Sequence, residues 1–331
     1  NLPWRKNRTP YSVWISEMML QQTQAKTVIP FYNKWMKKFP NIQSLKSAKI
    51  EEVLKSWEGL GYYSRCHNIY GAAKNLDRIP NTYEELISLP GIGDYTAKAI
   101  LSIAYKKKYV GIDTNLQRVA SRYLGIKNLT KKNLQRISIA LEKSQPEDSP
   151  GDYNEALMDL GRHVCTSTKT LCTKCPLVAG CKAVKSKNPL LYPLPIKRTK
   201  KIKVQAAVCC IFNKKKQILL QKRENTRLLS GLWEFPGGKL EKNETPIKAV
   251  KREIEEEIKV KIRKPKYCGQ IKHSYSSYNV EIHVFMVFLD DTTIIKDNEK
   301  LKWVFKKNLI NFAMPKANHK IISLLNQYSS D

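Results

Sequence analysis

A change of pattern near residue 190 most constrains how this chain can fold. Before it, apolar residues recur at helical spacing, as in residues 13–28, 50–57 and 95–105. Residues 186–203 contain three prolines and many lysines, a composition typical of an exposed linker. After it, β-forming residues dominate. We therefore expect a multidomain chain, with an all-α half followed by an α+β half.

The length of the chain suits two independent domains. Its 331 residues are many for one compact domain. We expect a helical domain over residues 1–185, a linker over 186–203 and a second domain over 204–326. Among the strands of the second domain, one helix is predicted at 245–258 and a last one at 316–327.

The charge balance favours a polyanionic partner. The formal net charge is +30, from 59 Lys and Arg against 29 Asp and Glu. Such an excess favours nucleic acid or anionic lipid, and solvated lysine-rich faces are the alternative. No apolar run reaches the length of a membrane span, and no secretory signal opens the chain. The chain begins at Asn1 rather than Met, so we expect an N-terminal piece to be missing.

The cysteines are clustered. Four of the eight lie within residues 165–181, in the spacing C-x6-C-x2-C-x5-C. They are Cys165, Cys172, Cys175 and Cys181. Four thiolates at such spacing can close around a [4Fe–4S] cluster, and a tetrahedral zinc site is the alternative. A secreted disulfide framework would spread its cysteines more evenly, so we expect a reducing compartment.

A glycine turn lies between two predicted helices at residues 89–97. Gly91 and Gly93 allow the backbone there to approach a partner closely. The next helix start then offers free N–H groups, which suit a phosphate. An ordinary helix connection is the alternative, because Gly-x-Gly alone is a weak signal.

Two carboxylates are candidates for catalysis. Asp113 stands in Ile-Asp-Thr-Asn, a short distance after the glycine turn. Glu17 lies in the apolar helical segment 14–24, where a buried carboxylate costs free energy unless it has a role. Periodicity alone leaves open that Glu17 simply points outward.

Together these motifs resemble the helix–hairpin–helix base-excision glycosylases, and most closely the adenine DNA glycosylase (MutY) family, over nearly the whole chain. The cysteine spacing is the one used by the endonuclease III and MutY branch, which favours a [4Fe–4S] subdomain over zinc. Endonuclease III-type enzymes form a Schiff base through a lysine where this chain has Tyr95. The resemblance therefore implies a monofunctional glycosylase that removes adenine opposite 8-oxoguanine or guanine in double-stranded DNA.

The resemblance also implies roles for the residues of the site. Glu17 would be the general acid that protonates adenine at N7, with a pKa raised by burial. Asp113, kept ionised, would stabilise the oxocarbenium-like sugar and guide water. Asn115 and Tyr95 match positions that support the carboxylates. The family usually has glycine where this chain has Thr114, which would move the aspartate if a positive φ were required.

Further family positions imply DNA contacts. Gln22 and Tyr62 match wedges that enter the duplex when the base is flipped out. Core packing is the alternative for both, and it is a stronger rival for the neighbouring Tyr63. Three residues match positions that line the adenine pocket or read the base: Trp4, Arg5 and Glu155.

The second half carries an acidic motif. Residues 238–257 follow the pattern G-x5-E-x7-R-E-U-x-E-E. On a helix, Glu253, Glu256 and Glu257 share one face, and Mg²⁺ or Mn²⁺ would neutralise them and bridge a diphosphate. A solvated acidic helix is the alternative.

This motif resembles the Nudix box of the 8-oxo-dGTP hydrolases (MutT), and implies that Gly237 and Arg252 support the ion. It departs from the box at Lys259, where the pattern has glycine. An added 8-oxo-dGTP pyrophosphohydrolase activity, or a pyrophosphohydrolase fused to a DNA-binding module, is one alternative function. An endonuclease III-like lyase is another, which Tyr95 and Glu17 disfavour.

A hairpin of the family touches 8-oxoguanine through Phe-Ser-His. Its nearest match here is Tyr275-Ser276-Ser277, without the histidine. Tyr275 and Ser276 are therefore the expected lesion contacts. By the same resemblance we expect a monomer of bacterial type, cytoplasmic and associated with the nucleoid, with no membrane partner.

Overall fold

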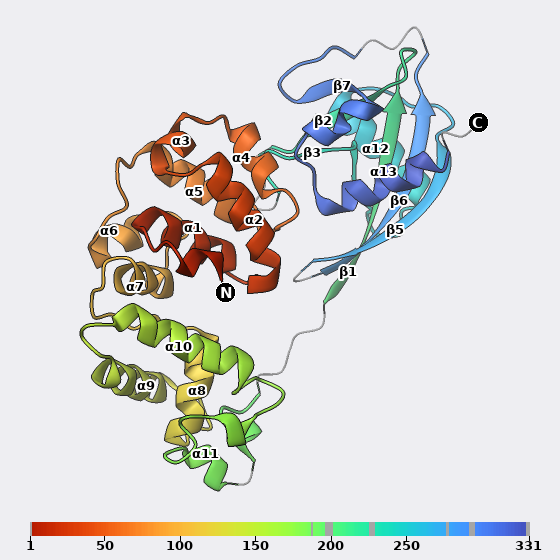
Figure 1. Cartoon of the computed structure of the whole chain (residues 1–331). Helices are drawn as coiled ribbons and strands as arrows, with labels where there is room; N and C mark the ends of the chain where they lie inside the picture. The colour runs from red at the N-terminus through yellow and green to blue at the C-terminus, as the bar shows by residue number, and fades with distance from the viewer. Residues whose placement is uncertain are drawn as a thin grey trace. The chain divides into compact units, whose positions relative to one another are not determined.

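A computed structural model describes residues 2–186, 188–195, 201–224, 229–275, 278–290 and 295–328. The chain divides into two compact units (Figure 1). The first unit comprises Asn1–Ser47 and His67–Arg198, and the second comprises Ala48–Cys66 and Thr199–Asp331. The second unit is therefore assembled from two separate stretches of the sequence. The expected domain boundaries at 185 and 204 placed residues 48–66 in the helical domain instead.

The first unit is built from α-helices, as the helical spacing predicts. Its longer helices are α1 (Pro10–Leu20), α2 (Ala25–Lys38), α5 (Ser64–Lys74), α7 (Asp94–Ile103), α8 (Thr114–Leu124), α9 (Lys131–Ser144) and α10 (Pro150–His163). Its shorter elements are η1 (Pro3–Arg5), α3 (Ile42–Ser47), α6 (Tyr83–Ser88), η2 (Cys172–Lys174), α11 (Lys182–Lys185) and η3 (Pro189–Leu191). The first residues of α5 belong to the second unit.

Helix α1 is buried around nearly its whole circumference. It begins where the Thr9 hydroxyl accepts a hydrogen bond from the Ser12 N–H (3.2 Å), with Pro10 in the first helical position. All residues from Tyr11 to Met19 are buried, because apolar side chains occupy every side of the helix. A carboxylate on this helix is therefore removed from water whichever way it points.

The second unit is a mixed β-sheet covered by helices. Its strands are β1 (Ile202–Phe212), β2 (Gln217–Lys222), β3 (Trp233–Glu234), β4 (Gly237–Lys239), β5 (Lys266–Ser274), β6 (Tyr278–Phe288) and β7 (Leu301–Phe305). The sheet order is β3-β2-β1-β6-β5, with β4 paired to β1 and β7 paired to β2. Strands β1 and β6 run parallel, from Ile202 opposite Tyr278 to Phe212 opposite Phe288.

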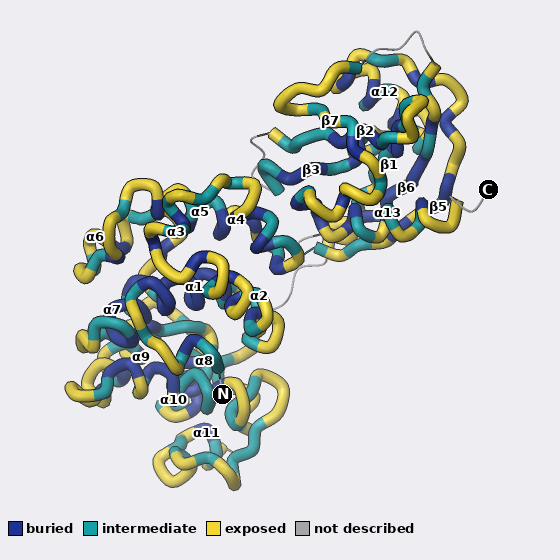
Figure 2. The backbone as a smooth tube through the Cα atoms, turned by 45° about the horizontal axis from the view of Figure 1, so that its top comes forward, coloured by how far each residue is buried: buried dark blue, intermediate teal, exposed yellow. Residues whose placement is uncertain are grey.

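Helices α12 (Pro246–Ile258) and α13 (Lys316–Asn326) pack on opposite faces of this sheet, close to their predicted bounds. One core joins α12 to Cys209 and its neighbours on β1, and the other joins α13 to Cys210. The alternation along β1 is what a sheet buried on both faces requires. Figure 2 shows the buried strands between more exposed helices. The unit also contains α4 (Ile50–Trp57) and η4 (Lys306–Asn311).

The expected linker is partly packed. The Arg122 Nε donates to the carbonyls of Pro189 (3.1 Å) and Tyr192 (3.0 Å), and the Leu194 N–H donates to Lys127 O (2.8 Å). Residues 189–194 therefore lie on the first unit, and β1 already begins at Ile202. Across the described ranges, no helix has both the length and the apolar character to span a membrane.

Candidate active site

Glu17 is the buried carboxyl at the centre of the first unit. Its side chain projects from α1 and the residue is 5% exposed. Burial raises the pKa of Glu17 to about 7, against hydrogen bonding by Tyr95, and the charges of Glu155 and Asp113 raise it further. Among the residues that the structure describes, no group donates to its buried Oε2. A carboxyl that is about half neutral near pH 7 and has a free oxygen can give a proton to a bound partner.

Asp113 is held as the N-cap of α8. Its Oδ1 accepts from the N–H groups of Asn115 (2.9 Å) and Leu116 (2.8 Å). Its Oδ2 accepts from Asn115 Nδ2 (2.6 Å). Three donors at the start of the helix hold the carboxylate in one orientation. Thr114 takes the first helical position of α8 without a positive φ, so the backbone there does not require glycine.

Tyr95 brings the two carboxyls into one neighbourhood. It lies on α7 with its hydroxyl buried, and burial followed by the charges of Glu17 and Asp113 raises the pKa of Tyr95. Its side chain hydrogen-bonds to Glu17, and its hydroxyl also lies 3.6 Å from Met158 Sδ. Glu17, Asp113 and Tyr95 therefore act on one another electrostatically, although they come from three separate elements.

Glu155, on α10, is a third carboxyl whose charge acts on Glu17. Its Oε2 pairs with Arg8 Nη2 (2.6 Å) and Arg5 Nε (3.3 Å). Arg5 also holds Asp159 through two hydrogen bonds (2.6 and 3.1 Å). Burial raises the pKa of Glu155 against the effect of both arginines. Trp4 beside Arg5 is buried and packs edge-on against the Tyr32 ring.

Arg8 was missed by the sequence reasoning. It bridges Glu155 to Asp152, with Nη1 2.6 Å from Asp152 Oδ1. Arg5 and Arg8 are three residues apart, and both pair with carboxylates of α10. This spacing in the sequence does not indicate which carboxylates the two arginines contact.

Gln22 and Tyr62 share an unusual backbone. Both have left-handed φ values, 55° and 49°, and both are exposed. A side chain in this region costs roughly 1–2 kcal/mol, and such positions gather at functional sites. Tyr62 is 38% exposed whereas Tyr63 is 4% exposed, so core packing describes Tyr63 and not Tyr62. Gln22 lies in the first unit and Tyr62 in the second.

The glycine turn is braced from α1. Gln21 Nε2 donates to the Gly91 carbonyl (3.0 Å) and to Thr96 Oγ1 (3.2 Å). Gly91 has a φ of 79°, and a Cβ there would meet Asn68 Nδ2 at 2.5 Å. Gly93 is the N-cap of α7, and a Cβ there would meet no atom within 4 Å. The open side of Gly93 leaves room for a phosphate at the helix start.

The four clustered cysteines line one small cavity, together with Arg122 and apolar side chains. Buried Arg122 places Nη1 3.2 Å from Cys165 Sγ, which suits an anionic group inside the cavity. In the described ranges no group of three or more His, Cys, Asp or Glu side chains is placed to hold a single metal ion as it stands. Four thiols around one cavity are a donor set that fits an iron–sulfur cluster, as it would zinc.

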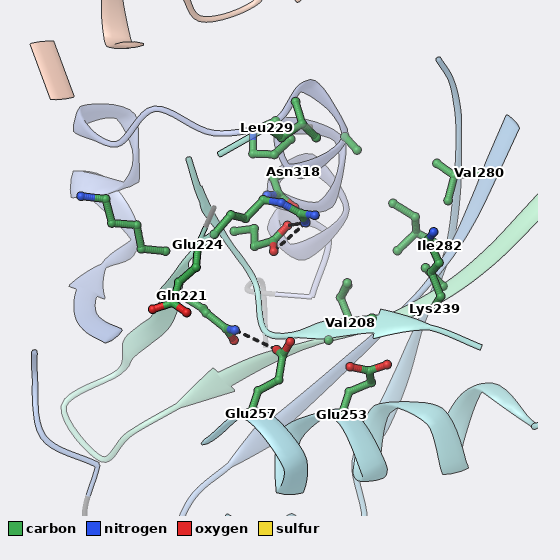
Figure 3. A pocket seen from close by; sticks show the side chains of 18 of the residues that line it. Val208, Gln221, Glu224, Leu229, Lys239, Glu253, Glu257, Val280, Ile282 and Asn318 are labelled. Carbon is green, nitrogen blue, oxygen red and sulfur yellow. Dashed lines mark hydrogen bonds and ion pairs between the residues drawn. The ribbon is translucent and has the colours of Figure 1, made fainter. Parts of the chain in front are cut away.

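The second unit has a cavity of about 760 Å³, the α12 cavity, lined by both acidic and basic side chains. Glu253 and Glu257 point from α12 toward it (Figure 3). Glu257 Oε2 accepts from Gln221 Nε2 (2.8 Å). Partial burial raises the pKa of Glu257 against this hydrogen bond, and Glu253 adds to the shift. Glu256 does not line the cavity; its carboxylate is 60% exposed and pairs with Arg252 (3.1 Å).

Gly237 beside this cavity is sterically required, because its φ is 142° and a Cβ there would lie 2.2 Å from the Ala207 backbone oxygen. At Gly238 a Cβ would meet only the flexible end of the Glu253 side chain, 2.3 Å from its carboxyl carbon. Arg252 holds Glu244 through two hydrogen bonds (2.9 and 3.0 Å) and Glu253 through one (3.0 Å). Arg252 therefore orients the acidic cluster from outside the cavity.

The far wall of the cavity is mixed in character. Tyr275 lines it, as does Asn318, which is buried and points inward (Figure 3). Asn318 was not anticipated, because a lone asparagine in an amphipathic helix carries no local signal. Ser276 lies outside the described residues.

Two family models match the chain. The model for the HhH-GPD superfamily of base excision DNA repair proteins matches residues 15–143, and a NUDIX domain model matches residues 207–324. An adenine DNA glycosylase of Buchnera aphidicola subsp. Schizaphis graminum is 34% identical, over 98% of this chain and 94% of that protein. The adenine DNA glycosylase of Homo sapiens is 32% identical, over 97% of this chain and 70% of that protein.

Among solved structures, a thermostable thymine-DNA glycosylase superposes on the chain with a TM-score of 0.52 at 29% identity. The match covers 56% of this chain and 89% of that one.

Proposed function

The chain belongs to the adenine DNA glycosylase family, and from this premise we propose that Glu17 and Asp113 divide the work of adenine release between them. The enzyme is a DNA N-glycosylase of base-excision repair. The observation that carries the proposal is a buried carboxyl with a pKa of about 7 beside an aspartate held by three donors. One is suited to give a proton and the other to face a positive charge.

Adenine is a poor leaving group while it is unprotonated. Glu17 transfers its proton to N7, the C1′–N9 bond breaks, and the bonding electrons leave with the base. The sugar then carries an oxocarbenium-like charge, which Asp113 stabilises until water adds at C1′. Asn115 fixes the Asp113 carboxylate, and the Tyr95 hydroxyl orients Glu17. Because residue 95 is not a lysine, it forms no imine, and the enzyme is monofunctional.

The substrate we propose is duplex DNA with adenine opposite 8-oxoguanine or guanine. Flipping the adenine costs a few kcal/mol, which Gln22 and Tyr62 would offset by filling the gap. Glu155, positioned by Arg5, would accept hydrogen bonds from the base, with Trp4 behind it. The glycine turn would hold the phosphate backbone, and the net charge of +30 would attract it. The enzyme would act as a monomer on the nucleoid.

We propose that Cys165, Cys172, Cys175 and Cys181 hold a [4Fe–4S] cluster. When bound, it supplies covalent cross-links that fix the loop between the cysteines. Lys169 and Lys174 of that loop would then meet the DNA backbone. Replacing Cys172 with serine should weaken duplex binding, measured by fluorescence anisotropy, and unchanged binding would contradict this role.

An incision assay tests the main proposal. A labelled duplex with one A:8-oxoguanine pair is incubated with enzyme, and half of the sample is then treated with alkali. Strand cleavage that requires alkali supports a monofunctional glycosylase, and cleavage without alkali indicates a lyase. Glu17→Gln and Asp113→Asn should each abolish base release while duplex binding persists. Turnover by Glu17→Gln would refute the assignment of the acid.

A second activity is favoured by the cavity beside α12. Glu253 and Glu257 meet there over two glycines that bring the backbone close, an arrangement that suits Mg²⁺ or Mn²⁺ on a diphosphate. We propose hydrolysis of 8-oxo-dGTP. Water attacks the phosphoanhydride between the α and β phosphates, the bridging P–O bond breaks, and the two products are 8-oxo-dGMP and pyrophosphate. Pyrophosphate release with Mg²⁺, compared with Glu253→Gln and Glu256→Gln, tests it. Release no greater than in the Glu253→Gln control would rule it out.

A further inference from the structure

The turn that carries Tyr62 belongs to the second unit. It follows α4 and contains Gly59, Gly61 and Tyr62, whose φ values are 96°, 83° and 49°. Internal bonds close it: Trp57 Nε1 donates to the Gly61 carbonyl (3.0 Å), and the Gly59 N–H donates to the Tyr63 hydroxyl (3.2 Å). Gly59 and Gly61 adopt a positive φ without steric cost but Tyr62 does not, so the turn needs fixed neighbours to hold Tyr62 in this conformation.

Glu58 supplies the fixed neighbours. This residue is the C-cap of α4 and directly precedes the turn. Its Oε1 accepts from the backbone N–H of Met314 (2.8 Å) and lies 3.1 Å from His319 Nε2. Its Oε2 pairs with Lys55, and Lys55 Nζ also donates to the Phe312 carbonyl (3.0 Å). Residues 312–319 are thus joined to the start of the turn through one carboxylate.

Burial makes the loss of this junction costly. The Glu58 side chain is 13% exposed, so its Lys55 and His319 partners would be left without their carboxylate where water reaches poorly. On the same helix, Glu51 makes a comparable ion pair with Lys222 (3.0 Å), but its side chain is 53% exposed. Exposed pairs of that kind contribute little. The two carboxylates therefore form a natural comparison on one helix.

The segment that Glu58 contacts also forms a wall of the α12 cavity. Pro315, Ala317 and Asn318 line that cavity, between the two contacts of Glu58. Burial raises the pKa of Tyr63, and Tyr275 adds to this shift, so the cavity-lining Tyr275 lies near the residue after the wedge. Residues 312–319 and Tyr275 thus link the cavity of the second unit to the Tyr62 turn.

We propose that Glu58 is a positioning residue that ties the Tyr62 turn to residues 312–319, so that recognition of the base opposite adenine sets the position of the wedge. The proposal rests on the proposed reading of 8-oxoguanine by the second unit. Glu58 touches neither adenine nor the reacting atoms. Its loss should therefore remove the preference for 8-oxoguanine and spare the chemical step.

The first measurement is the ratio of single-turnover rate constants for adenine opposite 8-oxoguanine and opposite guanine, with the full chain. Glu58→Gln keeps an oxygen that can accept from Met314 but loses the charge. We expect this variant to lower the ratio about tenfold, with the rate on A:G within twofold of the wild type. Glu51→Gln, the matched control, should keep the wild-type ratio. An unchanged ratio in Glu58→Gln, or an equal fall of both rates, overturns the proposal.

The second measurement does not depend on any lesion. Amide hydrogen exchange at residues 59–65 should be at least tenfold faster in Glu58→Gln and unchanged in Glu51→Gln. Unchanged exchange in Glu58→Gln also overturns the proposal. If the wild type itself shows no preference for 8-oxoguanine, the proposed recognition of the lesion by the second unit fails. Amide hydrogen exchange alone then tests whether Glu58 holds the Tyr62 turn to residues 312–319. Should Glu58→Gln not fold, His319→Gln removes one partner and must shift both readouts in the same direction.

Discussion

Because α1 is buried on all sides, the Glu17 carboxyl keeps its proton at a pH where an exposed glutamate has lost it. The apolar run around Glu17 predicts a buried helix, but it gives no direction in which the carboxyl points, since every face of α1 is buried. Asp113 was a candidate because of the Ile-Asp-Thr-Asn motif, and its capping contacts, which the motif did not predict, are with neighbours close in sequence. Arg8 and Asn318 act through contacts far along the chain, which no local pattern contains.

The rate of adenine release should depend on pH through Glu17. With a pKa of about 7, the neutral acid is the major form below that pH and the minor form above it. We expect the single-turnover rate constant on A:8-oxoguanine to fall about tenfold per pH unit above the pKa. Rapid-quench measurements between pH 6 and 9 check this, and a flat profile would mean that Glu17 does not act as the acid.

The same carboxyl should make folding stability pH-dependent. The pKa of Glu17 rises from 4.5 to about 7 on folding, so the folded state holds a proton that the unfolded state releases between these values. The contribution of Glu17 to stability is therefore fully present below pH 4.5 and is lost as pH rises toward 7, by roughly 3 kcal/mol. We expect Glu17→Gln to be more stable than the wild type at pH 8 but not at pH 4.5, by urea denaturation. Equal pH dependence of both proteins would contradict the shifted pKa.

At the scale of elements, periodicity predicted α12 and α13 to within a residue or two, since both present a clear apolar face to the sheet. It could not predict which carboxylates of α12 face the cavity. Glu253, Glu256 and Glu257 share a helical face, yet Arg252 draws Glu256 aside into solvent. The spacing of Glu253, Glu256 and Glu257 therefore predicts that they share a helix face, but not which of them could bind a metal ion in the cavity.

The C-terminus of α12 carries a strained residue. Lys259 is the C-cap in the left-handed region, with a φ of 62°, where the motif has glycine. We expect Lys259→Gly to stabilise the protein by roughly 1 kcal/mol, because glycine adopts this conformation without steric cost. Lys248→Gly, within the same helix, should instead destabilise it by about 1 kcal/mol. Thermal unfolding of both variants checks the opposite signs, and a loss of stability in Lys259→Gly would contradict the assigned strain.

At the scale of the whole molecule, the positive charge should dominate the binding of DNA. The net charge of +30 is spread over both halves of the sequence. If the enzyme neutralises 6–10 phosphates, affinity for any duplex should fall by about 10³–10⁵ between 50 and 200 mM salt. Anisotropy titrations with Asp113→Asn, which binds without turnover, measure the slope. If the logarithm of the affinity hardly changed with the logarithm of the salt concentration, the lysines would be solvated rather than bound to phosphates.

Composition separated the helical half from the sheet half, but it could not show that residues 48–66 belong with the sheet. Helix α4 has ordinary helical spacing, and its partners lie about 250 positions later, as in the Glu58–Met314 contact. Local patterns carry no information on such long-range contacts, whereas the change at the linker is visible in composition alone.

This split assembly bears on how the protein is made. Residues 48–66 leave the ribosome well before residues 312–319, which Lys55 and Glu58 contact, and synthesis of the remaining chain takes roughly ten seconds or more. During that time these contacts cannot form, and closing so long a loop is a slow, entropically costly event. Nascent chains stalled after residue 198 should therefore be vulnerable to proteases around residues 48–66, and completion of translation should end that vulnerability.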